Sequence, residues 1–111
     1  MIARVLIALV ALIHLYILVL EMFLWRTRAR RIFGMSAEQA EATAKLAANQ
    51  GLYNGFLAAG LVWSLFTDLD RASFFLVCVA LAGIYGGISV NRRIVYVQTI
   101  PALAALLALH F

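Results

Sequence analysis

Four apolar stretches separated by short polar turns make up most of this chain, and they restrict its fold more than any other feature. The chain has 111 residues, of which 66% are hydrophobic and 13% are charged. A soluble domain of this length has too little interior to bury so much apolar surface. We therefore expect an all-α membrane protein, a single domain over residues 1–111 that folds as a four-helix transmembrane up-down bundle.

The expected helices cover about residues 2–25, 37–66, 72–90 and 94–110. A cleaved signal peptide is disfavoured at the start, because no small-residue cleavage site follows the first apolar run and the basic cluster comes after it. Ser36 and Gln39 have the spacing of a capping box, so helix two is expected to begin before its membrane span and to extend into the cytoplasm. Pro101 predicts a kink in the fourth helix.

Basic residues are concentrated in the first and third loops. The positive-inside rule then predicts that both termini lie outside and that loops one and three are cytoplasmic, with a bacterial plasma membrane as the default location. The Arg-rich first loop is expected to meet anionic lipid head groups. No basic surface interleaved with aromatic residues remains outside the spans, which excludes a nucleic-acid partner. The basic residues on the cytoplasmic side are Arg26, Arg28, Arg30, Arg31, Lys45, Arg92 and Arg93, against Arg4 and Arg71 on the other.

Polar side chains within the expected spans gather in the cytoplasmic half. The densest group is Asn49-Gln50-Gly51-Leu52-Tyr53-Asn54-Gly55, and such polar groups are unfavourable in a membrane unless they find partners or line a cavity. Glu21 is the only acid within a span, and His14 lies about 10 Å deeper on the same helix. The pattern predicts a pocket with Glu21, His14 and Tyr53 as the reactive groups. Its predicted ligand-binding residues are Asn49, Gln50, Asn54, Trp25, Tyr85 and Gln98.

Each of these residues also has a structural interpretation. Glu21 is either a proton carrier or a carboxylate held by Arg26, Arg28 or the amides, and the amides are either a binding site or hydrogen bonds between helices. His14 is a satisfied structural histidine, an acid/base partner of Glu21 or a haem ligand. Haem is the least favoured of the three because the other histidine, His110, lies at the opposite surface. No cofactor is expected, and a single cysteine excludes a cysteine-cluster metal site.

Small residues recur at helical spacing at Gly51 and Gly55 and again at Gly83 and Gly87. Such spacing lets helices approach closely. We interpret these glycines as contacts within the chain or, alternatively, as the seam of a homodimer. On helix two, the glycines are expected to lie on a different face from Gln50, Tyr53 and Asn54.

Three segments carry a resemblance to a known family: residues 14–25, Phe33-Gly34, and the run Asn49-Gln-Gly-Leu-Tyr-Asn-Gly-Phe-Leu-Ala-Ala-Gly60. They resemble a family of small bacterial membrane proteins known as domain of unknown function 1304. The likeness covers nearly the whole chain, and the Asn-Gln-Gly-x-Tyr-Asn-Gly string is quite specific to that family. The resemblance implies four transmembrane helices and implies no activity.

Three functions remain compatible with the sequence. The first is a membrane pocket, open to the cytoplasm, that binds a small, mostly apolar molecule or converts it by proton transfer. The second is a proton-coupled exporter of small molecules that acts as a dimer. The third is a non-catalytic membrane assembly partner, which would use the Arg cluster and the extended start of helix two as contacts.

Overall fold

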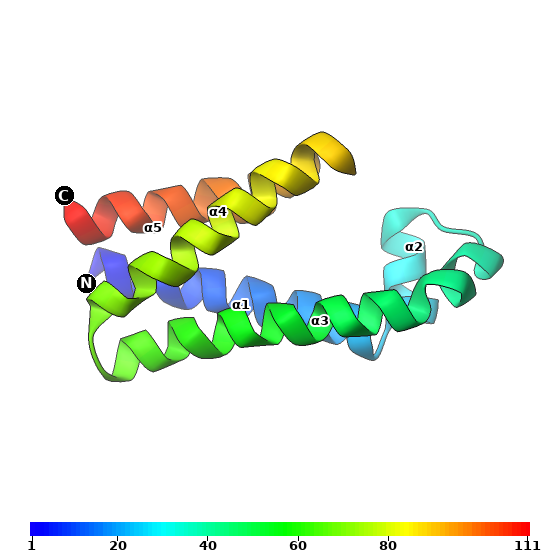
Figure 1. The fold of residues 1–111 in the computed structure, drawn as a ribbon, viewed down its shortest axis with the longest axis horizontal. Helices are drawn as coiled ribbons and strands as arrows, with labels where there is room; N and C mark the ends of the chain where they lie inside the picture. Colours follow the sequence, from blue (N-terminus) through cyan, green and yellow to red (C-terminus); the bar gives the residue numbers. More distant parts are fainter. The chain divides into compact units, whose positions relative to one another are not determined.

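A computed structural model describes all residues from 1 to 111, and the chain is helical without any strand (Figure 1). The all-α prediction is confirmed. Two π-helices, η1 (Trp25–Ala29) and η3 (Val95–Thr99), precede α2 and α5, and a short 3-10 helix, η2 (Leu69–Arg71), precedes α4. The five α-helices are α1 (Ile2–Met22), α2 (Arg30–Phe33), α3 (Ala37–Phe66), α4 (Ala72–Ser89) and α5 (Ile100–His110).

Two helical segments are long and apolar enough to cross a membrane, namely α1 and Leu69–Ser89. Helix α3 is longer than either, but its first half is polar and its amides dilute the apolar half. The last apolar segment, Val95–His110, is shorter. Two of the four expected spans thus have the required length and apolar character, and the four-span bundle stays a prediction.

Helix α1 ends three residues earlier than the sequence indicated. The backbone N–H groups of Phe23 and Leu24 both donate to the carbonyl of Val19, at 3.0 and 3.1 Å. The second of these bonds spans five residues, so the helix widens and leads into η1. As a result Trp25 belongs to η1 rather than to α1.

A second widened turn precedes Pro101. The helix expected from residue 94 passes after Ile94 into the π-helix η3, and α5 starts only at Ile100, with Pro101 in its first turn. Proline is tolerated there because its missing N–H would have no helical partner at that position. The change from π-helix to α-helix lies directly before Pro101, and the kink expected at that residue stays a prediction.

The chain divides into two compact units, which are described separately. We call residues 1–13 together with 57–111 the terminal unit, and residues 14–56 the middle unit. Helices α1 and α3 each contribute residues to both units.

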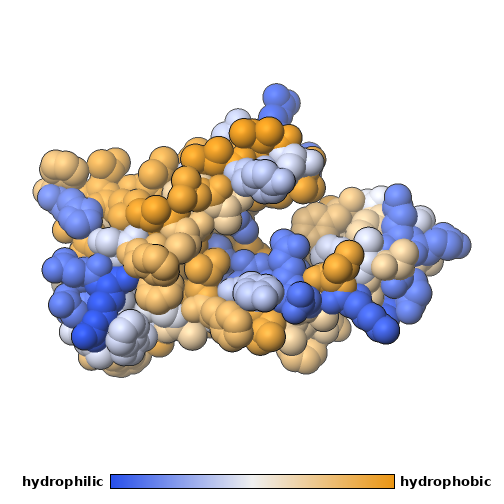
Figure 2. Space-filling view, in the orientation of Figure 1, coloured by the Kyte–Doolittle hydropathy of each residue, from blue (hydrophilic) through white to orange (hydrophobic).

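The core of the terminal unit is formed mainly by apolar side chains. Helix α4 packs beside η3 and α5, and hydrophobic side chains cover the visible surface of α4 and α5 (Figures 1 and 2). Gly83 makes this approach possible, because a Cβ atom there would collide with the side chain of Thr99. The Thr99 hydroxyl donates to the carbonyl of Ala80 at 3.0 Å. The core residues are Ile7, Val10, Ala11, Leu61, Ala72, Leu76, Val79, Ala80, Ala102 and Ala105.

The middle unit begins with the end of α1 and returns through η1 and α2 to the start of α3. Gly34 ends α2 with a positive φ of 66°, the left-handed conformation that favours glycine. The predicted capping box then starts α3: Gln39 N–H donates to Ser36 Oγ at 3.1 Å, and Ser36 N–H donates to Gln39 Oε1 at 3.0 Å. Hydrophilic side chains gather over α2 and the start of α3 (Figure 2).

The four glycines of the predicted small-residue stripes all face neighbours within the chain. In the middle unit, Cβ atoms at Gly51 and Gly55 would meet Met22 and Leu18 of α1, at 2.7 and 2.6 Å. In the terminal unit, a Cβ at Gly83 would meet Thr99 and one at Gly87 would meet Val95. Contacts within the chain thus use these surfaces, and a homodimer through them stays a prediction.

Candidate functional site

The polar centre of the middle unit is a buried hydrogen bond between α1 and α3. Asn54 Nδ2 donates to Glu21 Oε1 at 2.6 Å, and the two residues are 8% and 9% exposed. The helices approach closely because Gly51 has no side chain, and a Cβ there would lie 3.0 Å from the Cβ of Glu21. Asn54 follows Gly51 by about one turn and shares its contact face. The expectation that Asn54 lies on a different face from the glycines is therefore wrong.

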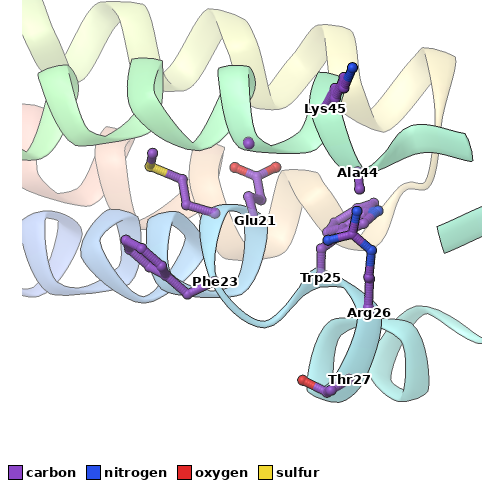
Figure 3. Close-up of a pocket in the computed structure, with 9 residues that line it drawn as sticks. Glu21, Phe23, Trp25, Arg26, Thr27, Ala44 and Lys45 are labelled. Carbon is purple, nitrogen blue, oxygen red and sulfur yellow. The ribbon is translucent and has the colours of Figure 1, made fainter. Parts of the chain in front are cut away.

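Next to this bond a hollow of about 410 Å³ opens between the end of α1, η1 and the first half of α3. We call it the Glu21 groove. Glu21, Trp25 and Arg26 extend toward α3, whereas Thr27 points away from it (Figure 3). An acid, two cationic residues and a mostly apolar wall thus surround one space. The lining residues are Glu21, Met22, Phe23, Trp25, Arg26, Thr27, Ala44, Lys45 and Ala48.

Two side-chain contacts tie η1 to α3 and define the wall of the groove. The indole N–H of Trp25 donates to Thr43 Oγ1 at 3.0 Å. Arg26 forms an ion pair with Glu41, with 2.5 Å between Nε and Oε2 and 3.1 Å between Nη2 and Oε1. These hydrogen bonds, with the attraction of opposite charges, lower the pKa of the Glu41 carboxyl and raise that of the Arg26 guanidinium.

The groove has the chemistry to receive a molecule with one polar group. Glu21 Oε1 accepts the Asn54 amide, while Oε2 has no hydrogen bond within the chain and can accept one from a donor in the groove. Lys45 makes no ion pair within the chain and also lines the groove, and its ammonium end points away from Glu21 (Figure 3). Met22, Phe23 and Trp25 offer apolar surface for the rest of the molecule.

Three of the predicted site residues come together here: Glu21 and Trp25 line the groove, and Asn54 binds Glu21. His14 is buried in α1, at 1% exposure, and does not line the groove. Asn49 and Gln50 are exposed. Tyr53 is also exposed, at 61%, and its ring packs edge-on against Phe56 at 5.7 Å.

The two remaining predicted residues belong to the terminal unit. Tyr85 is 74% exposed on α4, and Gln98 is partly buried in η3. The sequence grouped them with the amides by depth in a membrane, and depth alone does not determine which face of a helix a residue occupies.

Sequence reasoning missed the contribution of the first half of α3, which it assigned to a cytoplasmic extension. Ala44, Lys45 and Ala48 line the groove, and Glu41 and Thr43 bind η1. A signal for this contribution was present in the sequence, because small residues recur every three or four positions along the buried side of α3. That buried stripe is Ala40, Ala44, Ala47, Gly51, Asn54 and Ala58.

No group of three or more His, Cys, Asp or Glu side chains is arranged to hold a metal ion. The polar groups that line the groove are the Glu21 carboxylate, the cationic side chains of Arg26 and Lys45, the Trp25 indole and the Thr27 hydroxyl, and the Asn54 amide binds the carboxylate from beside the groove. Any role for a prosthetic group at His14 stays a prediction.

Fold and site together define the class of the protein: an all-helical chain with two helices of membrane-spanning length and a buried acid–amide pair beside a groove. The chain belongs to the family described as "Protein of unknown function (DUF1304)", which matches residues 8–110. It is similar to "Uncharacterized protein YpaA" of Lactococcus lactis subsp. lactis (strain IL1403), with 33% identity over 109 residues, 93% of this chain and 92% of that protein. No solved structure matches the chain. The resemblance noted in the sequence is thereby confirmed.

Proposed function

We propose that this chain is an integral membrane protein whose Glu21 groove binds a small, mostly apolar molecule through one polar head. The observation that carries the proposal is the buried Glu21 carboxylate, which faces the groove and is held by only one partner, Asn54. A buried ionisable group in an apolar helix is uncommon unless it has a function.

The head of the ligand would donate a hydrogen bond to Glu21 Oε2, and its apolar body would lie against Met22 and Trp25. The Asn54 amide orients the carboxylate, as a fixed hydrogen-bond donor does for a general acid or base. Glu21 would also exchange a proton with a bound molecule that carries an acidic or basic head. Proton-transfer isomerisation of a lipid-like molecule is the reaction that these groups suit.

Native mass spectrometry of the protein, released gently from its own membrane, tests this proposal. We expect wild type to retain a small molecule that Glu21→Gln loses. Ala48→Phe should lose it as well, because a larger side chain at Ala48 fills the groove without changing its polar groups.

Ala42→Phe is the matched control, since Ala42 is exposed on the same helix and does not line the groove. It should retain the molecule as wild type does. Equal retention by wild type, Glu21→Gln and Ala48→Phe would contradict the proposal.

Proton-coupled export by a dimer is a second candidate, and one observation favours it: Glu21 is the only acid in α1 and is buried. In that case substrate binding would release a proton from wild type but not from Glu21→Gln. Substrate flux in liposomes would distinguish export from binding alone. An assembly role would instead be indicated by a stoichiometric partner that purifies with the chain.

We further propose a four-helix up-down bundle with both termini outside and loops one and three in the cytoplasm. The support is the length and apolar character of α1 and α4 and the excess of basic residues in those two loops. This orientation would open the Glu21 groove toward the cytoplasm. Reporter fusions at Phe111 and in the loop at Gly34 should report opposite sides of the membrane; the same side for both would contradict the topology.

A further inference from the structure

The middle unit has a second hollow, shallow and open to the surface, of about 480 Å³; four exposed residues line it, namely Tyr16, Arg28, Arg31 and Ile32. We call it the arginine hollow. It shares no lining residue with the Glu21 groove. The two arginines come from η1 and α2, which follow directly after α1, and Tyr16 comes from α1 itself.

The arginine hollow carries positive charge that the chain does not neutralise. Of its neighbours, Arg26 pairs with Glu41, and Arg30 Nε donates to the carbonyl of Met35 at 3.3 Å. Arg28 and Arg31 make neither an ion pair nor a hydrogen bond within the chain, and no acid lines the hollow. Two guanidinium groups beside one space therefore favour an anion there.

The donor set fits a phosphate group. Guanidinium forks bind pairs of phosphate oxygens, which a single ammonium does less specifically. The Tyr16 hydroxyl adds a further donor. The Tyr16 ring and Ile32 add apolar surface, which a free phosphate would not use but the glycerol and first methylenes of a lipid would.

The position of Tyr16 along α1 indicates the source of the phosphate. Tyr16 lies six residues before the end of α1, which is about 9 Å along a helix long and apolar enough to cross a membrane. The hollow would then lie at the level where acyl chains meet head groups, and basic pockets beside membrane helices bind phosphate head groups there. We infer that the arginine hollow binds the phosphate of an anionic phospholipid. This inference rests on the proposed membrane position of α1 and not on the Glu21 groove.

The test is native mass spectrometry of the purified full chain in neutral detergent, titrated with phosphatidylglycerol or phosphatidylcholine. Wild type should retain phosphatidylglycerol preferentially, and Arg28→Gln/Arg31→Gln should lower that affinity by about 30-fold. Arg28→Lys/Arg31→Lys keeps the charge and the fold but lacks the guanidinium fork, so it should show a smaller loss. The matched control Arg92→Gln/Arg93→Gln removes the same charge from another exposed turn and should stay within about twofold of wild type.

Three results would overturn the inference. Unchanged phosphatidylglycerol retention in Arg28→Gln/Arg31→Gln would show that the lipid does not bind at the arginine hollow. An equal loss in Arg92→Gln/Arg93→Gln would indicate diffuse attraction of the basic surface. Displacement of the lipid by an equal concentration of glycerol 3-phosphate would identify a soluble phosphate compound as the ligand. Glu21→Gln should retain phosphatidylglycerol fully. The proposal for the Glu21 groove and the inference for the arginine hollow can therefore fail independently, because different variants test them.

Discussion

The two units of the chain are stabilised in different ways. The terminal unit packs small and branched apolar side chains against each other, and its two buried polar side chains, Ser64 and Thr99, bond only to backbone carbonyls. The middle unit is tied by polar side chains at successive levels of α3: Glu41 to Arg26, Thr43 to Trp25, and Asn54 to Glu21. Apolar packing needs only shape, whereas a buried acid–amide pair also holds a reactive group in a fixed position. This difference supports the proposal that the middle unit holds the binding site while the terminal unit has a structural role.

Substitution of glycine should give the largest loss of stability, and the loss should differ between the two units. Gly83→Ala should destabilise the protein by about 3 kcal/mol, because the new Cβ meets the Thr99 side chain and lies 2.9 Å from its backbone nitrogen. Gly51→Ala should cost less, about 1 kcal/mol, because its nearest contact is the flexible Met22 side chain at 2.7 Å and the Cβ of Glu21, at 3.0 Å, has to shift only slightly. Unfolding in mixed micelles with increasing dodecyl sulfate would measure both. Ala82→Val, at an exposed site on α4, is the control, and the reverse order would contradict the comparison.

The acid–amide pair should give the next largest effect. Asn54→Ala leaves the Glu21 carboxylate buried without its partner and should cost about 2 kcal/mol in the same unfolding measurement. Asn49→Ala, at an exposed position on the same helix, should change stability by less than about 0.5 kcal/mol. Equal effects at the two amides would mean that burial of this pair does not organise the middle unit.

The Trp25–Thr43 hydrogen bond should contribute less. Trp25→Phe keeps most of the aromatic surface but removes the indole N–H, so it should destabilise by about 1 kcal/mol. A double-mutant cycle with Thr43→Val measures the coupling directly, because both single changes remove the same bond. Additive effects would show that the bond does not hold η1 against α3.

The smallest effect concerns the exposed Arg26–Glu41 ion pair. The hydrogen bonds from Arg26 lower the pKa of Glu41 below its ordinary value of 4.5, so the pair's contribution is full above that pH. It is then lost as the pH falls through the lower pKa of the folded state. Over that acid range, amide hydrogen exchange of residues 25–43 should be slightly faster than the pH dependence of the intrinsic exchange rate alone predicts. In Glu41→Gln this extra acceleration should be absent, and its persistence would exclude the ion pair as the cause.

Much of the helical fold was predictable from the sequence because it follows from local patterns. Ser36 and Gln39 start α3 as a capping box, and the apolar run of α1 is long enough to cross a membrane. The widened turns at Leu24 and before Ile100 were not predictable, because they depend on which carbonyl the backbone N–H groups find in the packed structure.

The site was predictable only in part. Glu21, Trp25 and Asn54 were identified because polar groups in apolar segments are unfavourable without partners. Gln50 and Tyr53 were grouped with Asn54 by helical spacing, yet they are exposed. The buried face of α3 is instead marked by the stripe of small residues through Gly51. The positions of the amides do not indicate which face that is.

The most direct test of the central claim is labelling of Glu21 by dicyclohexylcarbodiimide, a small apolar reagent that attacks carboxyl groups in apolar surroundings. In liposomes we expect a single adduct on Glu21 and none on the exposed acids Glu38, Glu41, Asp68 and Asp70. Ala48→Phe should slow the labelling strongly, and Ala42→Phe should leave its rate unchanged. An unlabelled Glu21, or equal rates in the two variants, would contradict the claim that this carboxyl opens onto a groove for a small apolar molecule.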